Sequence, residues 1–290
     1  MNKDSFDKIL LAIDSTAPSW AAVGAIAQLA ATTGAEVLVL HVWNLGVRVN
    51  AGTWNVETLT EARELVDEVV ADLVAAGVKA SGELVNAAES KVGSAIEDAA
   101  ESYGADLVAV GSRGLSDLAA IFEGSVSHRL IADLDCPVLV AGAGSYRSRP
   151  LQRILLAVSN QAEAAALADL AIAVAKPTGA SILVLHVLIH PMVANEYAFY
   201  LEPEEEAQAV VDRTIERIRT AGLEAAGKVK GGILPVVDEI VETAQGWDAD
   251  LLITGSRRHR DLAALLVGAT EHELIRQARR PVLIAARETR

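Results

Sequence analysis

Short apolar runs alternate along the chain with longer segments in which apolar residues recur at helical spacing. Residues 8–14 and 36–43 are mainly aliphatic, and each run has the length of a buried strand. The segment between them, residues 21–32, predicts a helix that follows the turn and cap residues 15–19 and ends at Gly34. The order strand, helix, strand begins an α/β pattern.

The same alternation continues as far as residue 141. A polar loop extends to about residue 55, and after it we expect, in order, a helix at 56–76, a weak strand at 79–86, a helix at 93–103, a strand at 106–111, a helix after Gly124 and a strand at 137–141. This alternation predicts a parallel sheet with helices on both faces and right-handed crossovers. Such sheets bind ligands at the carboxyl ends of their strands, where the strand order reverses. We therefore expect a site where Asp14, Val42 and Gly111 end their strands.

The whole pattern occurs twice. Lys8–Ser15 returns as Arg153–Asn160, a shift of 145 residues. Four further segments return in the same order at a shift of 145 or 144 residues: 38–42 as 183–187, 111–113 as 255–257, 117–120 as 261–264, and 136–141 as 280–285. Each copy has the size of a domain rather than of a solenoid repeat. We predict two tandem domains, at residues 1–143 and 151–290, on either side of a joint rich in Gly, Ser and Pro.

The composition indicates which residue types form the core and which classes of partner are unlikely. Hydrophobic residues make up 51% of the chain and aromatic residues only 4%, so we expect a core of Ala, Val, Leu and Ile. A net charge of −14 without a long basic stripe argues against nucleic acid and anionic membranes as partners. The single cysteine, Cys136, excludes an intrachain disulfide. No signal-peptide core and no membrane-spanning run is found, so we expect a cytoplasmic protein.

A glycine-rich motif follows the fourth predicted strand of the first copy. Gly111 is followed after two residues by Gly114, and after nine more by Gly124 and Ser125. Glycines lack a Cβ and let a backbone approach a ligand closely, although they also occur in ordinary turns. Gly124 and Ser125 open the next helix, whose free N–H groups favour a phosphate chain. The hydroxyls of Ser125 and Ser127 add further donors to this predicted phosphate cradle.

In this motif the sequence resembles the universal stress proteins, whose ATP-binding signature is Gly-x2-Gly-x9-Gly-Ser. The ends of the first two strands, at Asp14-Ser15 and His41-Val42, are also similar to that family, as are the closing segment Cys136–Val140 and the tandem arrangement. The resemblance covers both copies. It implies, in each domain, a Rossmann-like fold of the adenine nucleotide α-hydrolase type with a five-stranded parallel sheet.

The resemblance also implies an ATP site in the first domain. Asp14 would lie beside the nucleotide, the backbone of Val42 would contact the adenine, and Gly111 and Gly114 would lie along the ribose and phosphates. The phosphate chain would be held by the start of the next helix, that is, by Gly124, Ser125, Val126 and Ser127. Arg113 is a candidate for additional positive charge, and Mg²⁺ is expected to accompany the phosphates.

The second copy departs from the motif. Gly255 is kept, but Arg258 replaces the second glycine, and Ala269 replaces the serine after Gly268. Ser159 stands where the first copy has Asp14. An arginine at a close-approach position fills space that a ligand needs, so we predict that the second domain binds ATP weakly or not at all.

Three functions fit these residues. A regulator or sensor would bind ATP in the first domain and signal its occupancy, and the resemblance implies a role in stress response. A slow ATPase is an alternative, with Asp14 as the acidic candidate and Arg113 as a source of charge, but no convincing base supports fast hydrolysis. The third function is that of an interaction scaffold without a ligand. In this scaffold the closing strands at 138–141 and 282–285 would pair within one chain to form a pseudo-dimer, which could dimerise again through other surfaces.

Several polar residues outside the motif have structural explanations. His41 and His186 end buried strands and His128 lies on a helix, so we expect structural rather than catalytic roles for them. The basic run Arg257–Arg260 is expected to be a solvated loop, with the binding of an acidic partner, or of the phosphates of a ligand held differently, as the alternative. No zinc-ligand spacing, Walker-type phosphate loop or dinucleotide fingerprint is present.

Overall fold

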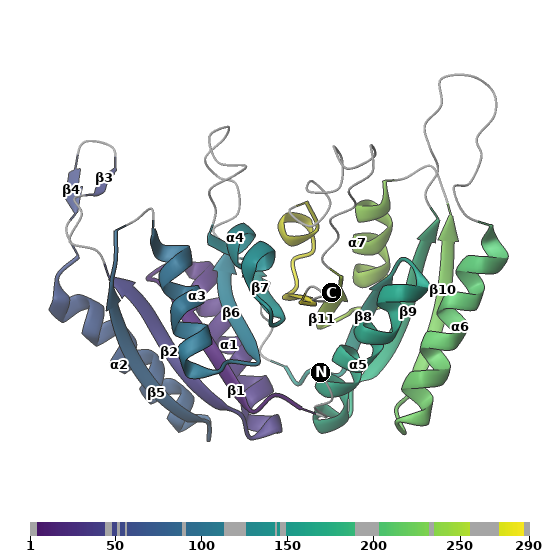
Figure 1. Cartoon of the computed structure of the whole chain (residues 1–290), viewed down its shortest axis with the longest axis horizontal. Helices are drawn as coiled ribbons and strands as arrows, with labels where there is room; N and C mark the ends of the chain where they lie inside the picture. Colours follow the sequence, from purple (N-terminus) through teal and green to yellow (C-terminus); the bar gives the residue numbers. More distant parts are fainter. Residues whose placement is uncertain are drawn as a thin grey trace. The chain divides into compact units, whose positions relative to one another are not determined.

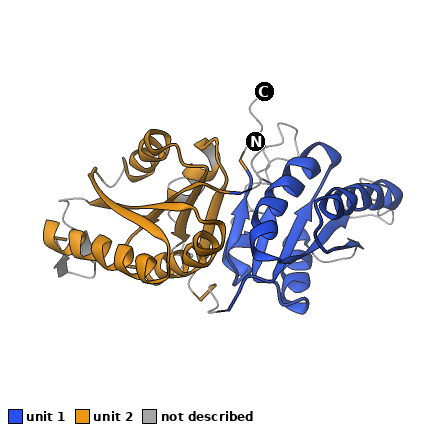
Figure 2. Cartoon of the chain, turned by 90° about the horizontal axis from the view of Figure 1, so that it is seen from below, with its two compact units in different colours: residues 1–5, 149–285 blue, residues 6–148, 286–290 orange. Residues whose placement is uncertain are grey.

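The chain folds into two compact units. The computed structural model describes residues 5–43, 48–50, 53–55, 57–88, 91–112, 126–142, 144–145, 149–188, 203–231, 235–255 and 273–286. One unit is built on residues 6–148 and the other on residues 149–285; Figure 2 shows them in different colours. We call them the N-terminal unit and the C-terminal unit and describe each by itself.

The N-terminal unit contains a parallel sheet of five strands. They are β1 (Lys8–Ile13), β2 (Glu36–Trp43), β5 (Lys79–Asn86), β6 (Leu107–Ser112) and β7 (Val138–Gly142). Their order is β5-β2-β1-β6-β7, and every pair is parallel. The chain moves outward from β1 to β2 and β5, and then returns to the other side of β1. The strand order therefore reverses between β1 and β6, where a sheet of this kind binds its ligand.

Two helices cover each face of this sheet (Figure 1). Helices α1 (Ala17–Thr33) and α2 (Leu59–Ala75) pack on one face, while α3 (Val92–Tyr103) and α4 (Val126–Asp133) pack against each other and on the other face. Helix α2 begins at a reciprocal capping box, in which Thr58 accepts a hydrogen bond from the backbone N–H of Glu61 and the Glu61 carboxylate accepts one from that of Thr58. The layers confirm the α/β architecture expected from the alternation of elements.

The elements differ from the expected ones in two places. Helix α1 begins at Ala17, four residues earlier than expected, because Pro18 and Ser19 are compatible with the first turn of a helix. The loop expected after β2 contains a short antiparallel hairpin, β3 (Arg48–Asn50) and β4 (Thr53–Asn55). Strands of three residues are too short to give a recognisable alternation of apolar and polar positions.

The C-terminal unit repeats this topology. Its strands are β8 (Arg153–Val158), β9 (Ser181–Leu188), β10 (Ala225–Gly231), β11 (Leu251–Thr254) and β12 (Val282–Ile284), all parallel in the order β10-β9-β8-β11-β12. Its helices are α5 (Gln161–Thr178), α6 (Glu204–Thr220) and α7 (Val236–Gly246), and residues 273–277 are also helical. Each strand takes the place of its counterpart in the first copy, which confirms the tandem repeat.

Aliphatic side chains fill both sheet–helix layers. The buried core consists of Ala, Val, Leu and Ile, and within the described residues Phe6 is the one aromatic side chain in it. This confirms the expectation from composition. In the described part of the chain, no helix has both the length and the apolar character needed to cross a membrane.

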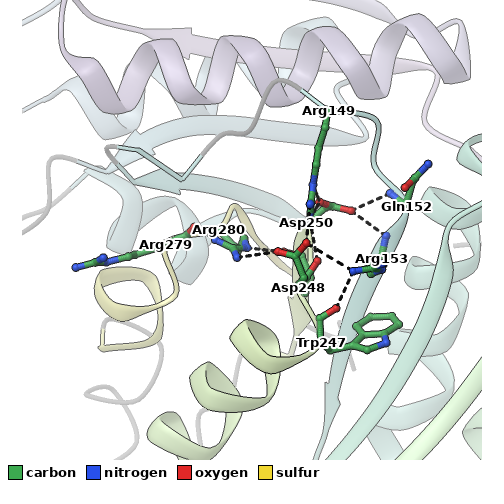
Figure 3. A network of polar contacts seen from close by, with 9 residues as sticks. Arg149, Gln152, Arg153, Trp247, Asp248, Asp250, Arg279 and Arg280 are labelled. Carbon is green, nitrogen blue, oxygen red and sulfur yellow. Dashed lines mark hydrogen bonds and ion pairs between the residues drawn. The ribbon is translucent and has the colours of Figure 1, made fainter.

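An aspartate anchors the first strand of each sheet at its amino end. Asp106 accepts hydrogen bonds from the backbone N–H groups of Asp7 and Lys8, and Asp250 accepts them from Gln152 and Arg153, each at 2.9–3.1 Å. In the C-terminal unit this anchor is part of a larger ionic network, shown in Figure 3.

The arginines of that network converge on two carboxylates. Arg149 donates to Asp248 and to Asp250, each at 2.6 Å, and Arg153 lies 3.6 Å from Asp248. Arg280, whose side chain is only 7% exposed, donates to the backbone carbonyl of Ala249 and lies 3.6 Å from Asp248. The network joins the start of the C-terminal unit to the start of β11. It lies where the strands of that sheet begin, not at their carboxyl ends, where sheets of this kind bind ligands.

Candidate functional site

The carboxyl ends of β1, β2 and β6 bring three of the predicted site residues to one edge of the N-terminal sheet. The last Cα pair of β1 and β2 is Ile13 with His41, so Asp14, which directly follows β1, comes next to Val42 near the end of β2. Val110 pairs with Ala12, which sets Gly111 level with Ile13. The strand register therefore assembles Asp14, Val42 and Gly111 at the point where the strand order reverses.

The start of helix α4 belongs to the same edge. Val126 is its first residue, and the helix packs on β6 and β7. Because β6 and β7 are parallel, the helix that connects them runs back from the carboxyl edge, so its amino end lies at that edge. Ser127 is in the first turn of α4. Arg113, Gly114, Gly124 and Ser125 lie outside the described residues, so their part in the phosphate cradle stays a prediction.

Asp14 shapes the turn between β1 and α1. One of its carboxylate oxygens, Oδ1, accepts hydrogen bonds from the backbone N–H of Thr16, at 3.0 Å, and from the Thr16 hydroxyl. Its own backbone N–H donates to Ser19 Oγ at 3.0 Å. Oδ1 is thus engaged in organising the turn that leads to Thr16, the N-cap of α1.

Gly111 is required by the packing of helix α1. A Cβ at this position would lie 2.5 Å from the backbone N of Ser19 and 2.6 Å from the carbonyl carbon of Pro18. Real Cβ atoms essentially never approach backbone atoms so closely. The absence of a side chain therefore lets the first turn of α1 rest directly on β6.

Val42 pairs with Val85 of β5, and the residues on either side of Val42 make further contacts. His41 is 5% exposed; its Nδ1 lies 2.8 Å from the backbone carbonyl oxygen of Ile13 and its Nε2 lies 2.9 Å from Glu57 Oε1. The indole N–H of Trp43 donates to the backbone carbonyl oxygen of Glu57 at 3.2 Å. Glu57 thus contacts both residues that flank Val42.

Glu57 is the residue that the motif analysis missed. It stands within the segment predicted to be a helix, and nothing in its immediate sequence marks it. The internal repeat does contain a signal: His41 and Glu57 correspond, at the shift of 145 residues, to His186 and Glu202. Glu202 lies outside the described residues.

The corresponding edge of the C-terminal unit carries a carboxylate. The Glu163 side chain accepts a hydrogen bond from Ser159 Oγ at 3.3 Å, and its Oε2 lies 3.1 Å from where a Cβ of Gly255 would be. The backbone N–H of Glu163 is capped by Asn160 Oδ1 at 3.1 Å. Glu163 occupies the position of Pro18 in the first copy, so a negative charge lies against the glycine that the two copies share. Arg257, Arg258, Gly268 and Ala269 lie outside the described residues.

Comparison with known sequences identifies the class of protein. The profile of the universal stress protein family matches residues 5–142 and again residues 150–286. The chain therefore belongs to the universal stress protein family, with two tandem domains of that family. In the described part of the chain, no group of three or more His, Cys, Asp or Glu side chains is placed to hold a metal ion.

Individual relatives each match one half of the chain. Universal stress protein YxiE of Bacillus subtilis is 30% identical over 150 residues, which cover 47% of this chain and 98% of that protein. A universal stress protein of Thermus aquaticus is 31% identical over 136 residues, which cover 47% of this chain and 98% of that protein.

A solved structure matches the whole chain. A universal stress protein of Archaeoglobus fulgidus DSM 4304 superposes with a TM-score of 0.71 at 22% identity, over 99% of this chain and 100% of that chain. The likeness at this identity is one of fold, and it extends over both units.

Proposed function

We propose that the chain is a nucleotide-dependent regulator or sensor in stress response, which binds ATP in its N-terminal unit. One observation carries the proposal: the complete run Gly-x2-Gly-x9-Gly-Ser starts at Gly111, at the strand-order reversal, where Asp14 follows β1 and Val42 lies near the end of β2. The same point of an α/β sheet is where ligands of this fold class bind.

The chemistry of the edge suits an adenine nucleotide. Val42 lies one residue beyond the last Cα pair of β1 and β2, where its backbone would contact an adenine edge. The amino end of α4, at Val126 and Ser127, presents backbone N–H groups and the positive end of a helix to a phosphate chain. Mg²⁺ bound with the phosphates would neutralise part of their charge.

We propose further that the C-terminal unit does not hold ATP under the same conditions. Arg258 and Ala269 remove two motif positions, and the Glu163 carboxylate against Gly255 adds a negative charge at the edge that phosphates would approach. Repulsion between this carboxylate and the phosphates would weaken binding, and the effect is greatest where water is partly excluded.

Regulation by occupancy fits the residues better than rapid hydrolysis. A phosphoryl-transfer enzyme needs a positioned base or an oriented water. Asp14 is the acidic group at this edge in the motif analysis, and its Oδ1 already accepts hydrogen bonds from Thr16. We infer that any ATP turnover is slow.

Nucleotide stoichiometry tests this proposal. The purified chain would be denatured with acid, the released small molecules identified by mass spectrometry, and ATP binding measured by titration calorimetry. We expect about one ATP per chain, and a rise in unfolding free energy of about 2.7 kcal/mol at a free ATP concentration one hundred times the Kd.

A matched pair of variants assigns the site. Gly124→Asp is expected to abolish ATP binding, because it adds a side chain and a negative charge to the phosphate cradle. Gly268→Asp makes the same change at the corresponding position of the second copy and is expected to leave binding unchanged. Two nucleotides per chain, or no binding and no thermal shift with Mg-ATP, would contradict the proposal.

A further inference from the structure

Strand β5 is the outer strand of the N-terminal sheet (Figure 1). It pairs with β2 along its whole length, and within the described residues no strand pairs with its other side. Just after the strand, the backbone N–H of Ala87 donates to the carbonyl oxygen of Trp43 at 3.1 Å, so the odd-numbered residues of β5 direct their backbone groups toward β2. Ala80, Gly82 and Leu84 therefore direct their N–H and carbonyl groups outward. Such a row of backbone groups is a template for one more strand.

The charges beside this edge are arranged for pairing with an identical strand. If two copies of β5 pair antiparallel around Ser81, Ala80 of one copy lies opposite Gly82 of the other, and the two exchange hydrogen bonds through their outward groups. Lys79 of one copy then lies opposite Glu83 of the other, in a non-hydrogen-bonded pair, where side chains come closest. A two-fold axis produces this opposite-charge pair twice.

The side chains of this register are accessible. Lys79, Ser81 and Glu83 are all exposed. They project from the face opposite to α2, because the position of the intervening Gly82 packs directly against α2. Helix α3, on their side of the sheet, packs mainly on β1 and β2. The Lys79 ammonium lies 3.6 Å from Glu36, but both side chains are exposed, so this contact holds the lysine only weakly.

Helix α2 adds an exposed apolar side chain beside the same edge. A Cβ at Gly82 would lie 3.3 Å from Val70 Cγ2, so Val70 lies over β5. Val74 follows one helical turn later on the same side of α2 and is 55% exposed. In the described part of the chain, Leu59 and Val74 are the two exposed large hydrophobic side chains, and both belong to α2. Pairing of two β5 strands would bring two copies of α2 together on one face and cover Val74.

The corresponding edge of the C-terminal unit is closed. Arg219 takes the position of Val74, and its Nε and Nη2 donate to the backbone carbonyl oxygen of Ala225 at 3.2 and 2.8 Å. The backbone N–H of Ile182 donates to the carbonyl of Glu224, so the next residue, Ala225, directs its backbone groups away from β9. The guanidinium therefore occupies a carbonyl that an added strand would need.

The charges on β10 also oppose pairing between the two kinds of edge. At the shift of 145 residues, Glu224 corresponds to Lys79 and Lys228 corresponds to Glu83. In an antiparallel pair of β5 with β10 in the same register, Lys79 would face Lys228 and Glu83 would face Glu224. Like charges directly opposite each other destabilise such a pair. A chain with one open edge that matches only itself forms a closed two-fold dimer rather than an open polymer.

We propose that two copies of the chain associate through β5, as an antiparallel strand pair centred on Ser81, into a dimer with a continuous sheet across the two N-terminal units. The two contacts between Lys79 and Glu83 set the register, and Arg219 keeps the edge of β10 out of the assembly. The proposal does not depend on nucleotide binding, because β5 is separated by β2 from the strand-order reversal between β1 and β6.

Charge reversal tests the register on the full chain, with the oligomeric state measured by sedimentation at micromolar concentrations. We expect a dimer for the wild type, and Glu83→Lys and Lys79→Glu should each raise the dimer Kd by about tenfold or more. A mixture of these two variants has complementary edges and should form a heterodimer. Lys228→Glu, the matched control on β10, should leave the dimer unchanged. Circular dichroism checks that each variant is folded.

Three outcomes of that experiment would overturn the proposal. A monomeric wild type excludes the dimer. A dimer that neither charge variant weakens uses a different surface. A mixture of the two variants that stays monomeric contradicts the register in which Lys79 faces Glu83.

A cross-link tests the centre of the strand pair independently. In a Cys136→Ala background, the Cα atoms of two Ser81→Cys residues would be about 4.5 Å apart, within the range of a disulfide. We expect diamide, as the added oxidant, to convert this variant into a covalent dimer at micromolar concentration. Ala226→Cys makes the same change at the corresponding position of β10 and should cross-link at least about tenfold more slowly. Equal rates for the two variants, or no cross-link at Ser81→Cys, would overturn the proposal.

Discussion

Gly111 and Gly255 occupy corresponding positions of the two copies, yet alanine should affect them very differently. At Gly111 the new Cβ would lie 2.5–2.8 Å from three backbone atoms of Pro18 and Ser19. At Gly255 the nearest atom would be Glu163 Oε2 at 3.1 Å, the end of a flexible side chain. A backbone in the first turn of a packed helix cannot move without displacing the helix, whereas a glutamate side chain can rotate.

The magnitude follows from these distances. Overpacking of a close-packed interior costs about 1–3 kcal/mol, and we place Gly111→Ala at the upper end because all three clashing atoms are backbone. Both substitutions also stabilise by about 0.4–1 kcal/mol through the lower entropy of the unfolded chain. We therefore expect Gly111→Ala to lower the unfolding free energy by about 2 kcal/mol, and Gly255→Ala to change it by less than about 1 kcal/mol.

Urea unfolding followed by circular dichroism, together with calorimetry, would measure the difference. Calorimetry is needed because two units in one chain can unfold in separate steps, which a two-state fit would hide. At about 4 °C per kcal/mol for a unit of this size, Gly111→Ala should lower the Tm of the N-terminal unit by about 8 °C. Equal losses for the two variants, or no loss at Gly111, would refute the argument that the backbone of α1 requires a glycine at this position.

Three further predictions concern residues at the amino ends of the strands. Asp250→Ala removes a carboxylate that is 9% exposed and that accepts hydrogen bonds from Arg149, Gln152 and Arg153. It should therefore lower the unfolding free energy by about 2–4 kcal/mol, as measured by urea unfolding. A loss below about 1 kcal/mol would contradict this prediction. Burial, with a smaller contribution from Asp106, raises the pKa of the Cys136 thiol from near 9 to about 11. At pH 8, iodoacetamide should therefore label this thiol much more slowly in the folded chain than in the urea-unfolded chain. Equal labelling rates would refute this prediction. The folded chain keeps the thiol proton to higher pH than the unfolded chain does, so the contribution of this thiol to stability is complete below about pH 9 and is lost as pH rises through about 11. Between these two pH values, the unfolding free energy of Cys136→Ala should therefore fall by about 2–3 kcal/mol less than that of the wild type, as measured by unfolding at each pH.

The local pattern of the sequence was enough to predict the strands of the sheet and the helices that cover it, although not the short hairpin β3–β4. The aliphatic run at 36–43 coincides with β2, the weak strand expected at 79–86 coincides with β5, and Gly34 ends α1 in the left-handed conformation that favours glycine. These features depend on residues within one or two turns of each other. The internal repeat also predicts the tandem organisation, because two similar segments of domain length are expected to adopt the same fold.

The contacts around the site and within the ionic network of the C-terminal unit depended on the tertiary structure instead. No spacing rule relates His41 to Glu57, sixteen residues away, or Arg149 to Asp248, ninety-nine residues away. Glu163 looks like an ordinary residue of a helix first turn, and only the packing of α5 on the sheet places its carboxylate against Gly255.

By itself, then, the sequence determined the order and type of the elements, the duplication and the place of the glycine motif at the end of β6. Periodicity carries that information, since the backbone of each element repeats every two or 3.6 residues. The tertiary structure decided why Gly111 has no side chain, what holds Val42 and what charge faces Gly255. Those features depend on which side chains from different elements meet, and that is fixed by the packing of helices on a sheet rather than by any local pattern.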